Sequence, residues 1–266
     1  MKNNIIFFYI IFQFYYSKIL CCEFEDNFKN PQKIELNKLI NNNIYHPINI
    51  YFDTIIFNSY KNKNILFKSF EILSELLKNL IIVKNNKILE IKKEQVQTLC
   101  NSKITFFSEN HNISNYDILI YFNFEEISSP INSNICAINS EDNRPIISLI
   151  TINSNFTFDN ITLNQIINLF LHQIIHILYF SKNYFIDEIN KGYINDIRMK
   201  KIADKFLLEH SKYGILLEKK GKLHWNEYLN SNDIMTSNNN NFELTELSIE
   251  FLELSPYYIL LIDVLY

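Results

Sequence analysis

Apolar positions recur along this chain in patterns that predict a mixture of strands and helices. Residues 48–52, 116–122 and 146–153 have the short alternating or nearly continuous apolar pattern of buried strands. Residues 64–83 instead repeat their apolar side chains at the spacing of an amphipathic helix. The order of these segments predicts an α/β (α+β) fold, with a twisted mixed sheet backed by a helix.

A second long helix is predicted to begin after Thr162. Thr162 and Gln165 form the Ser/Thr-x-x-Gln pattern of a capping box, and the residues that follow, to about Phe180, are apolar almost all round. A helix that is apolar on every side is a buried helix. Shorter helices are predicted at residues 197–208 and 245–254.

The N-terminal residues have the layout of a secretory signal peptide. An apolar run at residues 5–16 follows Lys2 and precedes an acidic stretch, so we expect residues 1–22 to be a leader. The run is shorter than the ~20 residues of a transmembrane helix. It could instead be an N-terminal core helix or a signal anchor. With the leader interpretation, the protein is expected to be secreted or located at the cell surface.

Composition narrows the classes of function. The chain of 266 residues is 47% hydrophobic, which is enough for a sizeable core. Its net charge is -4 and its lysines are scattered, so nucleic acid is not an expected partner. The chain has 39 Asn but only 3 Gly. Backbone positions that need a positive φ are therefore expected to use Asn, which tolerates that region.

Four cysteines are present, and two of them lie in or beside the predicted leader. Removal of the leader would leave Cys100 and Cys136, which we expect to form a disulfide in an oxidising compartment. Three sequons, at Asn112, Asn155 and Asn160, are candidate glycosylation sites in such a compartment.

The candidate chemistry centres on two histidines of the apolar helix. His172 and His176 are four residues apart, so both lie on one helix face and could bind one metal ion. The spacing fits a pair of hydrogen-bonded core histidines equally well. Gln173 occupies the position of the glutamate in the His-Glu-x-x-His zinc motif. A Gln amide can hydrogen-bond to water but cannot accept its proton, so the general base is missing.

A catalytic zinc site needs a third protein ligand. Glu188 could serve, as in enzymes whose third ligand is a glutamate. His224 is the stronger candidate because Met235 follows it by eleven residues. A methionine at that place could form an apolar floor beneath the metal.

These segments together resemble the leishmanolysin-like metallopeptidases, metzincins with a long insertion before the third zinc histidine. The resemblance covers residues 47–258. It is strongest in the His-Trp to Met-Thr segment, residues 224–236. The other matching segments are residues 143–153, 172–181 and 214–218.

The resemblance implies a zinc endopeptidase with one zinc ion, acting on a polypeptide substrate. His172, His176 and His224 would be the ligands, residue 173 the general base and Met235 the residue under the metal. It also implies a zincin-like lobe at residues 23–181 and a smaller lower lobe at residues 182–266, which is truncated relative to the family.

Three departures from the family pattern bear on activity. Gln173 replaces the base, and Asn143 and Tyr179 replace glycines. The ring of Tyr179 would crowd the end of the helix and could displace His176. We therefore expect a peptidase impaired at its general base. The alternative is a catalytically inactive pseudopeptidase that acts as a secreted or surface binding module. The sequence leaves the oligomeric state open.

Overall fold

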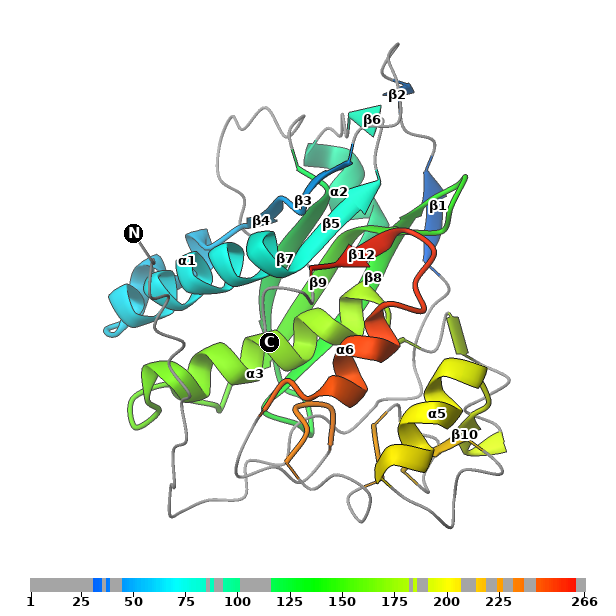
Figure 1. Ribbon diagram of the computed structural model, residues 1–266. Helices are drawn as coiled ribbons and strands as arrows, with labels where there is room; N and C mark the ends of the chain where they lie inside the picture. The colour runs from blue at the N-terminus through cyan, green and yellow to red at the C-terminus, as the bar shows by residue number, and fades with distance from the viewer. Residues whose placement is uncertain are drawn as a thin grey trace, which may run out of the picture.

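A five-stranded mixed sheet forms the centre of the protein in the computed structural model (Figure 1). The predicted mixed α/β architecture is therefore confirmed.

The predicted leader at residues 1–22 and the sequon at Asn112 lie outside the described residues. No helix within the described part of the chain has both the length and the apolar character needed to cross a membrane. The structure describes residues 31–34, 37–38, 45–84, 87–88, 93–100, 116–181, 184–185, 191–206, 214–218, 224–226, 232–236 and 243–261.

The central sheet combines parallel and antiparallel neighbours. In spatial order its strands are β1 (Gln32–Ile34), β8 (Ile131–Asn139), β9 (Pro145–Asn153), β7 (Ile118–Glu125) and β4 (Ile50–Phe52). The strands β4, β7 and β9 run parallel, and β8 runs antiparallel to β9. The apolar pattern predicts β4, β7 and β9 but misses β8. Polar residues interrupt the apolar pattern of β8, although the structure buries Asn132, Ser133 and Asn139.

Both faces of the central sheet are covered. Ile118, Ile120 and Phe122 of β7 pack into the core under α1 (Lys63–Leu80) and α3 (Leu163–Leu178), which lie side by side across one face (Figure 1). Leu119 and Tyr121 belong to a second core on the other face, which includes α2 (Lys93–Leu99). Burial on both faces explains why the apolar run of β7 is nearly continuous.

The predicted helix over residues 64–83 is wrong at its C-terminal end. The helix α1 stops at Leu80, and the next residues form the strand β5 (Ile81–Lys84). This strand is the middle one of a three-stranded antiparallel sheet, between β3 (Tyr45–Pro47) and β12 (Tyr258–Leu260). Ile81, Ile82 and Val83 are β-branched, which favours a strand once partner strands are present.

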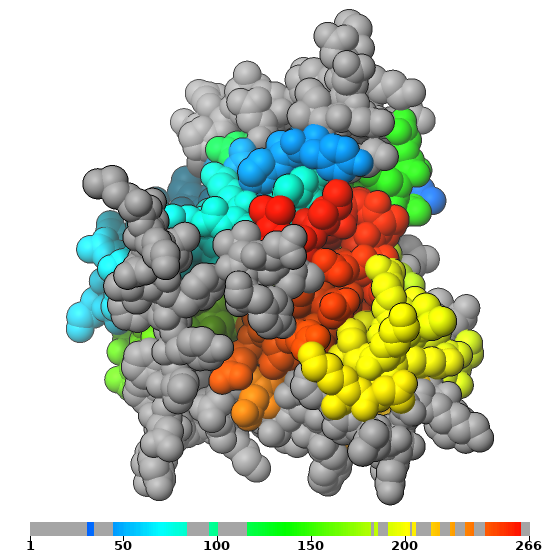
Figure 2. Space-filling model, in the orientation of Figure 1, coloured from blue at the N-terminus to red at the C-terminus, as the bar shows by residue number. Residues whose placement is uncertain are grey.

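The predicted shorter helices are present as α5 (Ile197–Phe206) and α6 (Glu246–Leu252), which adjoin on the face shown in Figure 2. The division into lobes at residue 181 remains a prediction. The other short elements are η1 (Ile55–Ser59) and the strand pairs β2 (Asn37–Lys38) with β6 (Lys87–Ile88) and β10 (Tyr193–Ile194) with β11 (Ile215–Leu216).

Asn143 confirms the expectation that asparagine replaces glycine at a left-handed position. Its φ is 61°, and it is the one non-glycine residue with a positive φ in the described part of the chain. Its N–H donates to Asn139 O at 2.9 Å, closing the turn between β8 and β9. An Asn can therefore occupy this turn where the resembling family has Gly.

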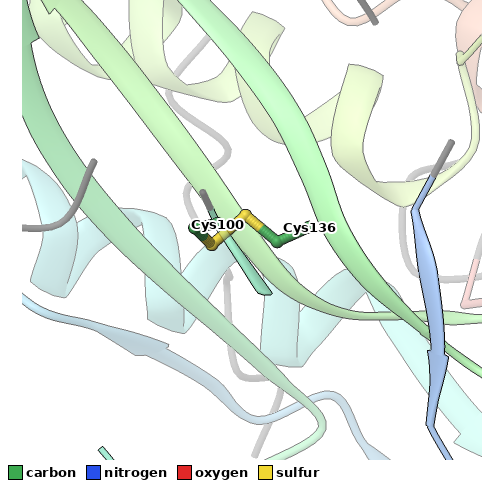
Figure 3. The surroundings of a disulfide bond; sticks show 2 residues. All are labelled: Cys100 and Cys136. Atoms are coloured by element: carbon green, nitrogen blue, oxygen red, sulfur yellow. A yellow bond between two sulfur atoms is a disulfide. The ribbon is translucent and has the colours of Figure 1, made fainter. Parts of the chain in front are cut away.

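The predicted disulfide joins Cys100, after α2, to Cys136 of β8 (Figure 3). The two Cα atoms are 5.0 Å apart, within the range that a disulfide requires. Both residues are buried in the second core. The bond thus ties the helix on that face to the central sheet.

Candidate metal centre

The helix α3 places His172 and His176 through its regular geometry. Its N-terminus has the predicted capping box: Thr162 Oγ1 accepts from Gln165 N–H, and the Gln165 side chain accepts from Thr162 N–H. From that start the helix continues without a break to Leu178. The two histidines are one turn apart on a face that is almost completely buried.

His224 arrives from an irregular segment that tertiary contacts hold in place. Leu217 forms an isolated bridge with Trp225, and Trp225 forms another with Thr236. The N–H of Trp225 donates to Met235 O at 2.9 Å, and the N–H of Glu218 donates to His224 O at 2.9 Å. These two hydrogen bonds fix both polar groups of the peptide bond that follows His224.

The three imidazoles converge on one point through their Nε2 atoms. The Nε2 atoms of His172 and His176 are 3.1 Å apart, and that of His224 lies 3.2 Å from each of them. Tetrahedral nitrogen ligands at about 2.0–2.1 Å from a zinc ion are about 3.3 Å from one another. The triangle therefore has the size that one metal ion needs, and it is the one such group among the described residues.

The Nδ1 atoms of the three rings each face an oxygen. His172 Nδ1 is 2.5 Å from Ile234 O, and His176 Nδ1 is 2.8 Å from Phe180 O. A carbonyl oxygen only accepts, so Nδ1 of each ring has the proton and donates it. For His224, the carboxylate oxygen Oε2 of Glu218 lies 3.4 Å from Nδ1, which favours the same tautomer.

These tautomers leave a lone pair on each Nε2, and the lone pairs face one another at 3.1–3.2 Å. No hydrogen bond between the Nε2 atoms of His172 and His176 can relieve that repulsion, because the protons of these two rings are on Nδ1. A cation at the centre would relieve it. Oxygen acceptors behind each ligating ring are also the arrangement that orients histidines in metal sites. The residues therefore fit a metal ion better than a pair of hydrogen-bonded core histidines.

Burial keeps His172 and His176 neutral. Desolvation lowers the pKa of His172 to about 4, although the Ile234 carbonyl opposes this effect. Desolvation, followed by the nearby His172 and His224 rings, lowers the pKa of His176 well below its ordinary value. Neutral imidazole is the form that binds a metal, so both ligands are ready at pH 7 without losing a proton.

The structure also places the other predicted site residues. Gln173 is fully buried on α3, next to His172. Met235 is fully buried and directly follows Ile234, the residue whose carbonyl accepts from His172. Its role as a floor beneath a metal remains a prediction. Glu188 lies outside the described residues. Asn155 and Asn160 are exposed between β9 and α3, where a glycan could be attached.

Tyr179 does not displace His176. The residue caps α3 with φ −155° and ψ −24°, and a negative φ does not require glycine. Its ring packs among Phe185, Phe251 and other aromatic rings, and its hydroxyl donates to Leu254 O at 3.3 Å. The Tyr179 ring is therefore accommodated among the aromatic rings around it.

Sequence reasoning missed the groups that orient the histidines. Two are the backbone carbonyls of Ile234 and Phe180, which no side-chain pattern can reveal. The third is Glu218, six residues before His224, whose role depends on how the chain turns between them. Comparison with protein-family models finds no match to this chain, and neither does comparison with curated proteins.

Proposed function

We propose that this protein is a leishmanolysin-like zinc metalloendopeptidase, secreted or held at the cell surface, whose peptide hydrolysis is impaired by Gln173. The observation that supports this most is the triangle of Nε2 atoms from His172, His176 and His224. Three histidines that leave a fourth position open are a usual ligand set of catalytic zinc. Such an ion, when bound, polarises a carbonyl group and lowers the pKa of water.

The protein's own groups have distinct tasks in this proposal. The three Nε2 atoms would bind the ion. The carbonyls of Ile234 and Phe180 accept the Nδ1 protons of His172 and His176, so that these two ligands keep their orientation, and the Glu218 carboxylate lies 3.4 Å from His224 Nδ1. In the sequence motif, Gln173 occupies the position of the general base. Its amide can hold a water molecule or a substrate carbonyl by hydrogen bonding, but it cannot take up a proton and pass it to a leaving amine.

A second candidate function has its own support. Loss of a positioned base commonly costs about 10²–10⁴-fold in rate, while the metal ligands are all in place. A site with intact ligands and no base fits a pseudopeptidase that binds a peptide-like surface partner without cleaving it. Both candidates share the metal centre, the polypeptide ligand and the location outside the cell, so hydrolysis separates them.

The deciding experiment pairs metal analysis with a peptidase assay on the full chain. The native protein should purify with about one zinc per chain, and it should cleave an unfolded protein substrate slowly. Gln173→Glu should raise the rate about 10²–10⁴-fold and leave zinc affinity nearly unchanged, because residue 173 is not a ligand. Gln97→Glu makes the same chemical change on α2, on the other side of the sheet, and should change nothing.

Three outcomes discriminate the candidates. Metal-dependent cleavage by the native chain as fast as by Gln173→Glu would show that another base operates. Zinc binding without cleavage by either form would favour the pseudopeptidase. Absence of bound metal in the native protein, even after dialysis against zinc, would refute both.

A further inference from the structure

A buried carboxylate outside the ligand set organises the segment beside the metal centre. Asp233 has no exposed surface, and one of its oxygens, Oδ1, accepts from Met235 N–H at 2.7 Å and from the Ser248 hydroxyl at 2.6 Å. Its other oxygen, Oδ2, accepts from the Thr245 hydroxyl. Asp233 thus binds its own turn to the residues that begin α6.

The same network includes residues beside two of the three histidines, His172 and His224. Ile234, next to Asp233, presents the carbonyl that accepts from His172 Nδ1. On the other side, Ser248 also accepts from Trp225 Nε1 at 2.9 Å, and Trp225 follows His224 directly. One carboxylate therefore connects the segment that orients His172 with the segment that brings in His224.

The backbone of this turn depends on the same residue. Thr236 N–H donates to Asp233 O at 3.1 Å, and Ile234 N–H donates to Glu243 O at 2.8 Å. Removal of the carboxylate would leave the buried Met235 N–H and Ser248 hydroxyl, and the half-buried Thr245 hydroxyl, without this acceptor. A buried donor without an acceptor is costly, so the turn would have to rearrange. Rearrangement would move the Ile234 carbonyl away from His172.

We infer that Asp233 is a positioning residue of the metal centre, acting on His172 through the Ile234 carbonyl and on His224 through Ser248 and Trp225. This inference rests on the proposed metal site. Loss of an outer partner of a metal-binding histidine typically weakens metal affinity about 10–100-fold. Asp233→Ala removes support on two sides and should fall in the upper part of that range.

The test measures metal binding by the full chain, with the metal itself as probe. Zinc affinity is obtained by competition with a chromogenic chelator, and the visible absorption spectrum of the cobalt(II) form reports ligand geometry. We expect Asp233→Ala to weaken zinc binding by about 10–100-fold and to change the cobalt spectrum. Asp233→Asn keeps one acceptor oxygen and should have a smaller effect. Asp53→Ala removes a buried carboxylate at the end of β4 and should leave the spectrum unchanged.

A milder pair of variants distinguishes a general loss of fold stability from a change in the position of the metal ligands. Ser248→Ala breaks the link between Asp233 and Trp225, whereas Ser69→Ala removes a buried serine of α1 that bonds only within its own helix in the described contacts. Ser248→Ala should weaken zinc binding and alter the cobalt spectrum, and Ser69→Ala should do neither.

The outcomes distinguish this inference from the proposed function. Native zinc affinity and an unchanged cobalt spectrum in folded Asp233→Ala, or in Ser248→Ala if the first variant does not fold, would overturn the inference alone. If the native chain binds zinc while Gln173→Glu cleaves nothing, the peptidase proposal fails and the role of Asp233 stands. If the native chain binds neither metal, both are overturned.

Discussion

The two regions that build the metal centre place their histidines by different means. His172 and His176 lie on α3, where one capped and regular helix sets their spacing. His224 lies on a segment with hardly any regular structure among its described residues, and bridges to Leu217 and Thr236 hold its neighbour Trp225. The helical pair follows from local geometry, whereas the third ligand depends on packing between segments far apart in the chain. Perturbations of distant packing should therefore affect the third ligand first.

Removal of a histidine ligand from either region should have the largest effect on zinc affinity. His176→Ala and His224→Ala each leave two nitrogens for the ion, so zinc affinity should fall by more than the ~100-fold that loss of an outer partner can cause. Chelator competition on the folded variants measures this. Equal zinc affinity for the native chain and His224→Ala would show that His224 is not a ligand.

Deletion of one large aromatic side chain in each region separates stability from metal binding. Trp225 and Phe70 are both buried. Trp225 packs against Phe180 and Phe251. Phe70 lies in the core between α1 and the sheet. Trp225→Ala and Phe70→Ala should each lower the free energy of unfolding by about 3–5 kcal/mol.

Zinc affinity should distinguish these two variants. Because Trp225 adjoins His224, its removal should also weaken binding by the folded protein, while Phe70→Ala should not. Denaturant titration with parallel zinc competition provides both values. A matching loss of affinity in both variants would mean that the two regions respond as one unit.

Substitution of two glycines should give a smaller difference in stability, at two positions with similar backbone conformation. Gly192 and Gly214 both have a positive φ, of 78° and 98°. A Cβ on Gly192 would meet nothing within 4 Å, but on Gly214 it would lie 1.9 Å from Ile194 O. Gly192→Ala should cost about 1–2 kcal/mol of backbone strain.

Gly214→Ala should cost about 1–3 kcal/mol more, since the strand β11 must shift on its approach to Leu217. Thermal and denaturant unfolding test this difference. Equal losses in the two variants would show that the segment leading to His224 can move without penalty.

The smallest expected effect is the pH dependence of the metal-free protein. His172 has a pKa of about 4 in the folded chain, against about 6.5 when unfolded. Between these pH values His172 is protonated in the unfolded chain but neutral in the folded chain. The free energy of unfolding therefore falls as the pH drops below about 6.5. The slope is about 1.4 kcal/mol per pH unit for each such histidine.

Denaturant unfolding in chelator at pH 7, 6 and 5 measures this slope. His172→Gln should flatten it by about that amount. An unchanged slope in this variant would mean that folding does not lower the pKa of His172.

Local pattern in the sequence was sufficient for much of the framework. The strands β7 and β9, the capping box of α3, and the shared face of His172 and His176 follow from periodicity over a few residues. The disulfide between Cys100 and Cys136 followed from cysteine number and the predicted leader. These features depend on interactions between near neighbours or on simple pairing, and both can be read along the chain.

Tertiary structure decided the remainder. Packing with β3 and β12 converted the end of the predicted first helix into β5, because partner strands outweighed the helical pattern. The spacing to Met235 and the family resemblance pointed to His224, but packing decided its approach to within 3.2 Å of His172, across 52 residues. The carbonyl of Ile234 behind His172 has no signature in residue spacing. A hydrogen bond between distant segments depends on how the intervening chain folds, and the energy that selects that path comes from burial and from buried donors finding acceptors.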